Sequence, residues 1–314
     1  MAVGPGMGAL PAPSWGGIYS GVDWRGADLR GVQLSCANLG GTRLEGADLS
    51  GAFLFDAYLA HVQGRGAKAR GASLPQAELN MAEFEGADFS QANLQGARLV
   101  AARLERACLR ESSLVGADLT AARLERVDLA GADLRGARLV DANLTGADLN
   151  GARLEGAVLV GSVLTDTCLE GAVLIDANLE RASLQGARLQ GADLQGARLV
   201  SCDLGQADLS ECALQGAHLP TDDKSALVDP RRAFASHGDG LAAALRTFAT
   251  LTQALEVSRD PRAGSVRQAL EEARRQMGWR DLHDNALPWT TRGRGFLRAL
   301  CSRARLARLQ AVPR

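Results

Sequence analysis

Large apolar residues recur at every fifth position through most of this chain. Between residues 130 and 154, which read AGADLRGARLVDANLTGADLNGARL, a Leu ends each five-residue step and an Ala stands two positions before it. A step of five advances about 500° around an α-helix, so these Leu side chains would spiral around the axis instead of forming a stripe. On a β-strand, an odd step reverses the face each time. The pattern therefore predicts a chain that turns a corner every five residues.

The five-residue spacing continues without an insertion from Trp24 to Leu219, which gives forty units. We call the large apolar position of each unit its centre. Leu holds most centres, and a small residue, usually Ala, stands two positions before each. Asp, Asn or Arg usually precedes the centre, and Gly is the commonest residue two positions after it. Stacked coils of such units would bury continuous columns of Leu, as in solenoid proteins.

The units ADLRG, ANLTG and ADLNG match the A(D/N)LxG pattern of the pentapeptide-repeat family, which the chain resembles over about 200 of its 314 residues. The resemblance implies an all-β solenoid, a right-handed quadrilateral β-helix with four units in each coil. Forty units would then make about ten coils. At the ~4.8 Å spacing of stacked strands, the rod would be roughly 50 Å long.

Three regions are expected along the chain. Residues 1–21 are rich in Gly and Pro and carry no charge, which predicts a flexible N-terminal segment. Residues 22–221 form the predicted β-helix. In residues 222–314 the apolar spacing changes to steps of three and four, for example from Leu241 to Leu255, which predicts a small α-helical C-terminal domain. No stretch is apolar enough to predict a membrane span.

A formal net charge of −1 hides an asymmetry between these regions. Residues 22–221 carry 26 acidic and 18 basic side chains, whereas residues 222–314 carry 10 acidic and 17 basic ones. Three interpretations of the basic C-terminal region stay open: a solvated surface, binding to nucleic acid or another anionic surface, and intermolecular docking on an acidic rod. Its candidate binding residues are Arg292, Arg294, Arg298, Arg303, Arg305 and Arg308.

Catalytic chemistry is not indicated. The sequence shows no nucleophile motif, no phosphate-binding loop and no metal-ligand spacing, and its four His are far apart. The six Cys form no CxxC pair, which fits reduced thiols in a cytoplasmic protein. We therefore expect no enzyme, no cofactor and no catalytic, cofactor-binding or metal-binding residues.

Two surface features are candidate binding sites. One is an acidic column on a single face, which could imitate DNA phosphates or reflect only the structural preference of the repeat for Asp before the centre. Arg30, Arg70 and Arg110 lie on the same face and dilute its charge. The other is an apolar contact patch on neighbouring faces of adjacent coils. The column comprises Asp28, Asp48, Asp88, Asp128, Asp148 and Asp208, and the patch comprises Val158, Val160, Val163, Val173 and Ile175.

The stretch from residue 60 to residue 75 contains centres that are smaller than the usual Leu. Two successive centres there are Gly64 and Ala69, which would leave the core thin. We therefore predict a bulge, a kink or a flexible point at this place, although the five-residue spacing is unbroken.

The leading functional hypothesis is a non-enzymatic scaffold that binds a protein partner. Some pentapeptide-repeat proteins protect DNA gyrase by imitating DNA, so a gyrase-binding DNA mimic conferring drug or toxin tolerance is the alternative that the resemblance implies. A net charge of −8 over the rod is about one charge per 6 Å, against one per about 1.7 Å in duplex DNA. This lower charge density is an argument against DNA mimicry by the rod as a whole. Nucleic-acid binding is expected of the basic tail and not of the rod, and a homodimer stays open.

Overall fold

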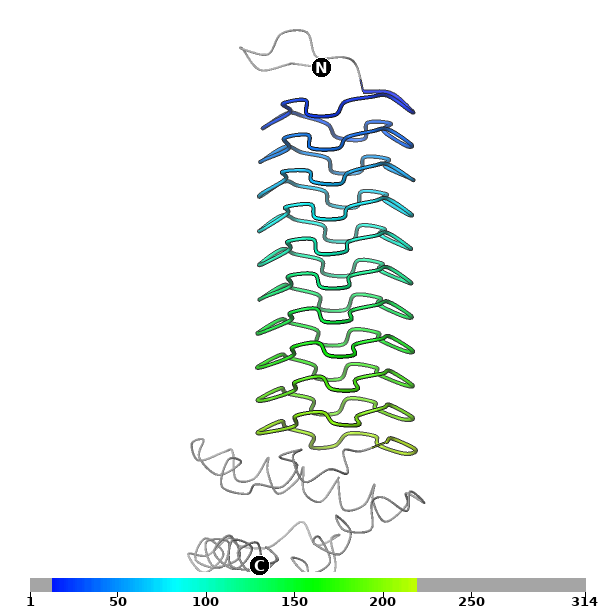
Figure 1. Ribbon diagram of the computed structural model, residues 1–314, viewed down its shortest axis with the longest axis vertical. Coiled ribbons are helices and arrows are strands. Elements are labelled where there is room, and N and C mark those ends of the chain that lie inside the picture. Colours follow the sequence, from blue (N-terminus) through cyan, green and yellow to red (C-terminus); the bar gives the residue numbers. More distant parts are fainter. Residues whose placement is uncertain (1–12, 219–314) are drawn as a thin grey trace, which may run out of the picture.

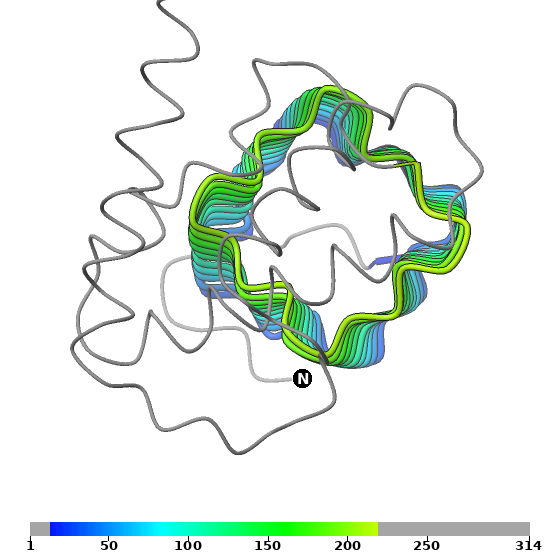
Figure 2. The same ribbon diagram turned by 90° about the horizontal axis from the view of Figure 1, so that it is seen from below.

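Residues 13–218 are described by the computed structural model, and they form a long parallel β-helix (Figure 1). Coils are joined by single-residue parallel bridges, which run from Ile18–Asn38 to Arg198–His218. The two residues of every bridge are twenty positions apart, so each coil contains four five-residue units, as the sequence predicts. Viewed along the axis, the coils superpose on one four-sided outline (Figure 2).

We number the four faces of the rod by their centres. The first and last centres of the described coils are Trp24 and Leu204 on face 1, Leu29 and Leu209 on face 2, Leu34 and Leu214 on face 3, and Tyr19 and Leu199 on face 4. Faces 1 and 3 are opposite each other, as are faces 2 and 4. Each corner residue is counted with the face that it follows.

One unit shows how the backbone groups are satisfied. The N–H of Asp148 donates to the carbonyl of Val127 in the preceding coil at 2.9 Å. The N–H of Leu149 donates to the carbonyl of Cys168 in the next coil at 2.7 Å. The N–H of Ala152 donates back to the Leu149 carbonyl at 3.0 Å and closes the turn. Leu149 and Ala147 are fully buried, so large and small inward residues alternate around the core.

Every corner of the described coils uses a left-handed backbone conformation. The residue two positions after the centre has φ between 52° and 73°, and it is Gly at 23 corners and another residue at 18. Only Gly adopts this conformation without a steric cost from Cβ, which explains why Gly is the commonest choice there. The stacked coils tolerate the remaining residues.

The β-helix begins before the expected boundary at residue 22. Ile18 already bridges to Asn38, and Tyr19 is buried at a face 4 centre. The Tyr19 ring lies 4.8 Å from the Trp24 ring, centroid to centroid. Tyr19 thus continues the five-residue spacing by one unit. The last predicted centre, Leu219, and the predicted helical domain at 222–314 lie outside the described residues.

The predicted bulge or kink near Gly64 and Ala69 is wrong. The centre N–H groups there donate to the next coil at 2.7 and 2.6 Å, as in regular coils, and the bridges continue. Phe84 and Phe89 occupy the centres one coil further along the same two faces, and their rings meet edge to face at 5.0 Å. The Phe84 ring occupies the space that a side chain on Gly64 would fill. Large centres therefore compensate for small ones across the coil boundary.

Polar residues at the small inward positions bond to the backbone. Thr42 Oγ1 donates to the Tyr19 carbonyl at 3.0 Å, and Thr167 Oγ1 donates to the Leu144 carbonyl at 3.1 Å. The Sγ of Cys212 makes the same kind of bond to the Leu189 carbonyl at 2.9 Å. Burial raises the pKa of the Cys212 thiol to about 12, so this thiol stays protonated and acts as a small core residue.

Candidate interaction surfaces

The six Asp of the predicted acidic column all lie on face 2, where they cap the turn that follows. The Oδ1 atoms of Asp48, Asp88 and Asp148 accept the backbone N–H two residues ahead at 3.0, 2.9 and 3.0 Å. Asn93 and Asn143 make the same bond on other faces at 3.1 Å. Of the two sequence interpretations, this geometry favours a structural preference of the repeat for Asp or Asn.

The acidic column is not continuous. Between its Asp residues, the bridge positions of face 2 hold Lys68, Cys108, Cys168 and Arg188. Arg30 pairs with Asp28 at 2.7 Å, and Arg110 pairs with Asp128 at 2.9 Å. A single column of Asp therefore cannot present an unbroken row of negative charge.

Two Asp near the N-terminal end, the half-buried Asp23 and the exposed Asp28, have a pKa well below the ordinary value. The side-chain hydrogen bond from Arg25 lowers the pKa of Asp23 to about 2, and the side-chain hydrogen bond from Arg30 lowers the pKa of Asp28 to about 2. In both cases the guanidinium also interacts coulombically with the charged carboxylate. These two carboxylates are held in local ion pairs.

Net charge is nevertheless distributed unequally over the four faces. Faces 2 and 3 together carry 14 acidic and 7 basic residues, whereas faces 1 and 4 carry 12 and 11. From residue 128 onward, faces 2 and 3 hold only three basic residues, Arg135, Arg153 and Arg188. The acidic residues of that region, which we call the acidic surface, are Asp128, Asp133, Asp148, Glu155, Glu170, Asp176, Asp193, Asp208 and Glu211. The predicted acidic column contains only the bridge Asp of face 2, so it does not include the carboxylates of face 3 or of the corners. Comparing residues twenty positions apart would have shown them in the sequence.

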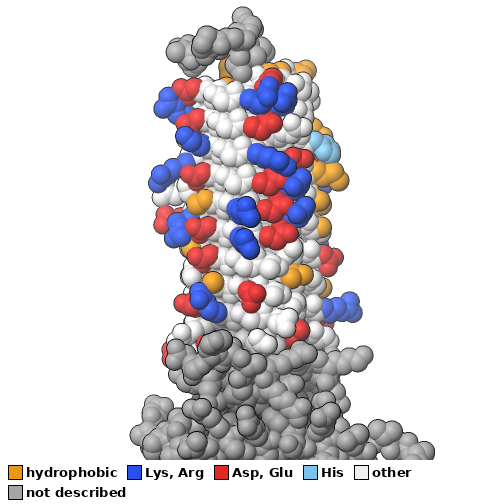
Figure 3. Space-filling model, turned by 90° about the vertical axis from the view of Figure 1, so that its left-hand side faces the viewer, with side chains coloured by type: hydrophobic (Ala, Val, Ile, Leu, Met, Phe, Trp, Pro, Cys, Tyr) orange, Lys and Arg blue, Asp and Glu red, His pale blue; other side chains and the backbone are white. Residues whose placement is uncertain are grey.

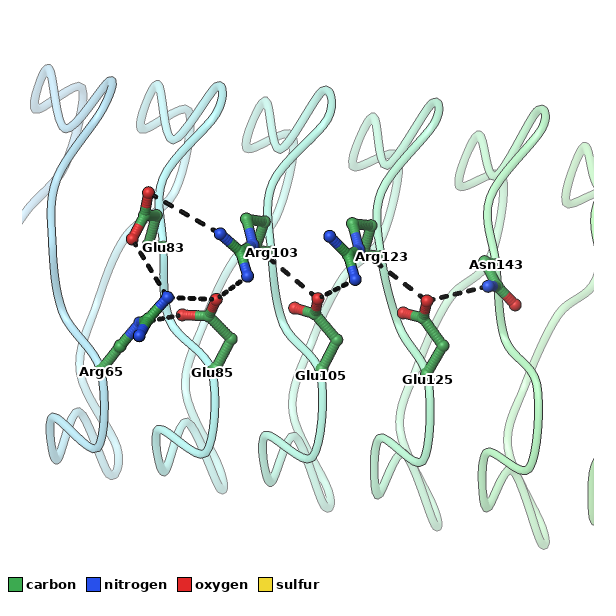
Figure 4. Close-up of polar contacts among 8 residues, drawn as sticks. All are labelled: Arg65, Glu83, Glu85, Arg103, Glu105, Arg123, Glu125 and Asn143. Atoms are coloured by element: carbon green, nitrogen blue, oxygen red, sulfur yellow. Dashed lines mark hydrogen bonds and ion pairs between the residues drawn. The ribbon is translucent and has the colours of Figure 1, made fainter.

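Face 1 carries a ladder of ion pairs along the rod axis (Figure 4). Arg103 Nη2 lies 2.6 Å from Glu85 Oε1, and Arg123 Nη2 lies 2.9 Å from Glu105 Oε1. Arg65 Nε reaches Glu85 Oε2 at 3.0 Å. The far end of the ladder is a hydrogen bond from Asn143 Nδ2 to Glu125 Oε1 at 2.9 Å.

The ladder neutralises the charge of face 1 locally. From Glu85 onward its members alternate in sign, because Arg103 and Arg123 precede their centres and Glu105 and Glu125 follow them. Arg65, at the start of the ladder, follows its centre instead. Figure 3 shows one side of the rod, on which acidic and basic side chains alternate along the axis. The sequence contains the signal for this ladder, but only when positions twenty residues apart are compared.

The predicted apolar patch is divided among three faces. Val158 and Val160 lie on face 4, Val173 and Ile175 lie on face 3, and Val163 lies on face 1. Val163 is 37% exposed, whereas the other four are half-buried. Because faces 1 and 3 are opposite, one flat partner cannot contact all five residues.

A second group of apolar residues comes from one coil near the N-terminal end. Phe53 and Phe55 on face 3 and Tyr58 on face 4 are between 42% and 49% exposed. The six Arg of the predicted basic tail lie outside the described residues.

Metal binding has no candidate cluster in the part of the chain that the structure describes. No group of three or more His, Cys, Asp or Glu among residues 13–218 is arranged to hold an ion. The same residues include no helix of the length and apolarity needed to span a membrane.

Comparison with known proteins identifies the class of this chain. Eight copies of the sequence model for pentapeptide repeats match residues 20–51, 54–96, 97–136, 137–174, 162–199 and 172–210. The chain therefore belongs to the pentapeptide-repeat family, whose members form right-handed quadrilateral β-helices. This confirms the resemblance and agrees with the four-sided coils described above.

Solved structures of pentapeptide-repeat proteins resemble the chain. HetL from Nostoc sp. PCC 7120, described as involved in heterocyst differentiation regulation, is 35% identical over 65% of this chain and 86% of its own, with a TM-score of 0.29. Rfr23 from Cyanothece 51142 is 38% identical over 31% of this chain and 61% of its own, with a TM-score of 0.24. The plasmid-mediated fluoroquinolone resistance protein QnrB1 is 21% identical over 68% and 94%, with a TM-score of 0.25. No curated protein matches the sequence.

Proposed function

We propose that this protein is a non-enzymatic scaffold that binds a protein partner through the side-chain columns of its β-helix. The observation that supports this proposal is the unequal charge of the four faces. Faces 2 and 3 carry a strong excess of acidic residues, while face 1 is neutralised by its own ladder. A backbone hydrogen-bonded from coil to coil holds these side chains at fixed spacing. A partner with a basic surface fits this arrangement.

A matched pair of triple variants tests the proposal. In the first, Asp148, Asp193 and Asp208 become Asn, which keeps the turn-capping oxygen as in Asn93 and Asn143 and removes only charge. In the second, Glu78→Gln, Asp118→Asn and Glu180→Gln remove the same charge from face 4. A partner captured by the full chain and by the face 4 variant, but lost from the first variant, supports the scaffold. Equal capture by all three proteins would count against it.

A DNA-mimicking inhibitor of a type II topoisomerase such as gyrase is the second candidate. The acidic surface has nine acidic and three basic residues, a net charge of −6 over five coils. Five coils span about 24 Å, so this region has about one net negative charge per 4 Å, denser than the rod average and nearer to duplex DNA. This local density favours the candidate more than the total charge does.

Supercoiling by purified gyrase, with and without a quinolone, tests the mimic directly. Inhibition or drug protection at micromolar protein, weakened by the Asp148/Asp193/Asp208 variant and kept by the face 4 variant, would support it. No effect up to tens of micromolar would remove this candidate and leave the scaffold.

The remaining proposals concern location and the tail. We place the protein in the cytoplasm, and the unoxidised thiols of Cys36, Cys108, Cys168 and Cys212 fit a reducing compartment. Binding of nucleic acid by the basic tail stays a prediction, as does a homodimer.

A further inference from the structure

The acidic surface occupies the end of the rod from which a basic segment continues. Its carboxylates lie between residues 128 and 211, and the described coils end at His218. Residues 222–314 then carry 17 basic and 10 acidic side chains. The last thirty residues, 285–314, contain seven Arg and no acidic residue. The two regions of opposite charge are thus consecutive in the chain.

Several carboxylates of the acidic surface have no ion-pair partner within the rod. Among residues 13–218, no ion pair links Asp148, Asp176, Asp193 or Glu211 to a basic side chain. Asp176 and Glu211 are exposed corner residues, and Asp148 and Asp193 are half-buried bridge residues. On face 1, four of the eight carboxylates contact an Arg of a neighbouring coil, and three of these four belong to the ladder or flank it.

Apolar side chains interrupt the acidic surface at one place. Val173 and Ile175 stand on either side of a face 3 centre, and Val173 bridges directly to Asp193. Both are half-buried. The surface therefore combines negative charge with a small apolar area, and it suits a segment that carries both Arg and apolar residues.

The sequence between residues 292 and 308 has this composition. It reads RGRGFLRALCSRARLAR, in which Arg alternates with Phe, Leu and Ala. Residues 219–291 separate it from the last described coil, and a chain of this length can extend far beyond the ~24 Å that the acidic surface spans. Because the segment is tethered to the same molecule, its concentration at the acidic surface does not depend on the protein concentration.

We infer that residues 292–308 bind the acidic surface on faces 2 and 3 of the same molecule. The basic segment covers the carboxylates that lack ion pairs and places its apolar residues against Val173 and Ile175. This intramolecular contact does not depend on an external partner. Where such a partner also binds the acidic surface, the segment competes with it.

A photo-crosslinking experiment on the full chain tests the contact. Benzoylphenylalanine replaces Leu306, the protein is irradiated, and the crosslinked peptides are identified by mass spectrometry. We expect adducts on faces 2 and 3 between residues 128 and 211, with a yield that dilution does not change. Because surface charges are screened within about 3 Å at 1 M salt, the yield should fall several-fold there.

The two triple variants provide the matched controls. Asp148→Asn, Asp193→Asn and Asp208→Asn together should lower the adduct yield several-fold, whereas Glu78→Gln, Asp118→Asn and Glu180→Gln together should leave it unchanged. Unchanged thermal unfolding of each variant shows that the rod remains folded. Adducts on faces 1 or 4, no adducts, or equal yields from both variants would overturn the inference. A yield that rises with protein concentration would place the contact between molecules and overturn it as well.

Discussion

At the scale of single residues, the size of each centre is matched to the coil beside it. Gly64 is buried against Phe84, and Ala69 is followed on the same face by Phe89. Close packing in a protein interior penalises both voids and overlaps, so such a pair must be judged together. This explains why a stretch that looks defective along the chain is regular in space.

Removing the Phe84 ring should leave a cavity above Gly64. We expect Phe84→Ala to lower the free energy of unfolding by about 3–5 kcal/mol, measured by urea denaturation. The double variant Gly64→Leu/Phe84→Leu restores the usual stack of two Leu and should recover most of the loss. If the double variant is less stable than Phe84→Ala alone, the proposed compensation is wrong.

The ion pair of Arg30 with Asp28 should be visible in a titration. Arg30→Gln removes the hydrogen bond that lowers the pKa of Asp28 to about 2, so this pKa should rise towards its ordinary value of about 3.9. A lowered pKa in the folded protein means that the stabilising contribution is present above about pH 4 and is lost as the pH falls towards 2. Carboxyl carbon shifts in NMR report it. Arg70→Gln, two coils away on face 2, should leave the Asp28 titration unchanged.

At the scale of the element, the face 1 ladder shows how one coil depends on the next. Glu85 contacts Arg65 of the preceding coil and Arg103 of the following one, so a single carboxylate links three coils. Exposed ion pairs are individually weak, and a network of partly buried ones is stronger because each side chain is already ordered by its neighbours.

A double-mutant cycle measures the Glu85–Arg103 contact. Glu85→Gln, Arg103→Gln and the double variant should give a coupling free energy of about 0.5–1 kcal/mol at low salt, which includes a reduction for solvent screening. The coupling should approach zero at about 1 M salt. The same cycle on Glu78 and Arg98, whose closest approach is 4.0 Å, should give a smaller value. Equal coupling at both sites would contradict a special role for the ladder.

The sequence predicts the structure of each five-residue unit more fully than the contacts between units of successive coils. Leu spacing, the small residue before each Leu, Gly at the corner and the capping Asp are all local to five residues, so they can be read directly from the chain. The ladder, the acidic surface and the Phe84–Gly64 contact join residues twenty positions apart. They follow only after the number of units per coil is known, and the family resemblance supplied that number. The same number decides where the predicted apolar patch lies. With four units in each coil, Val163 and Val173, which are ten residues apart, lie on opposite faces.

At the scale of the whole molecule, two periods operate together. The five-residue period fills the core, and the twenty-residue period aligns the surface columns. A change in length can therefore preserve the first period while it disturbs the second.

Two deletions separate these periods. Removing residues 116–135 takes out one coil, so every face should remain aligned and the shortened protein should fold. Removing residues 116–120 keeps the Leu spacing but turns all later units by one face, so residues that share a face before and after the cut no longer align along the axis. We expect both proteins to retain the β-helix by circular dichroism, and the shorter deletion to lower the unfolding temperature more. A greater loss from the twenty-residue deletion would argue against the column as the unit of surface stability.

The contact between Phe84 and Gly64 has a consequence for evolution. Neither residue can change size alone without creating a void or an overlap, so in related chains a bulky centre should accompany a small one twenty positions earlier. The substitutions that one centre tolerates then depend on the residue at the centre one coil away on the same face. Two neighbours in the sequence can diverge independently, while two residues separated by a full coil must covary.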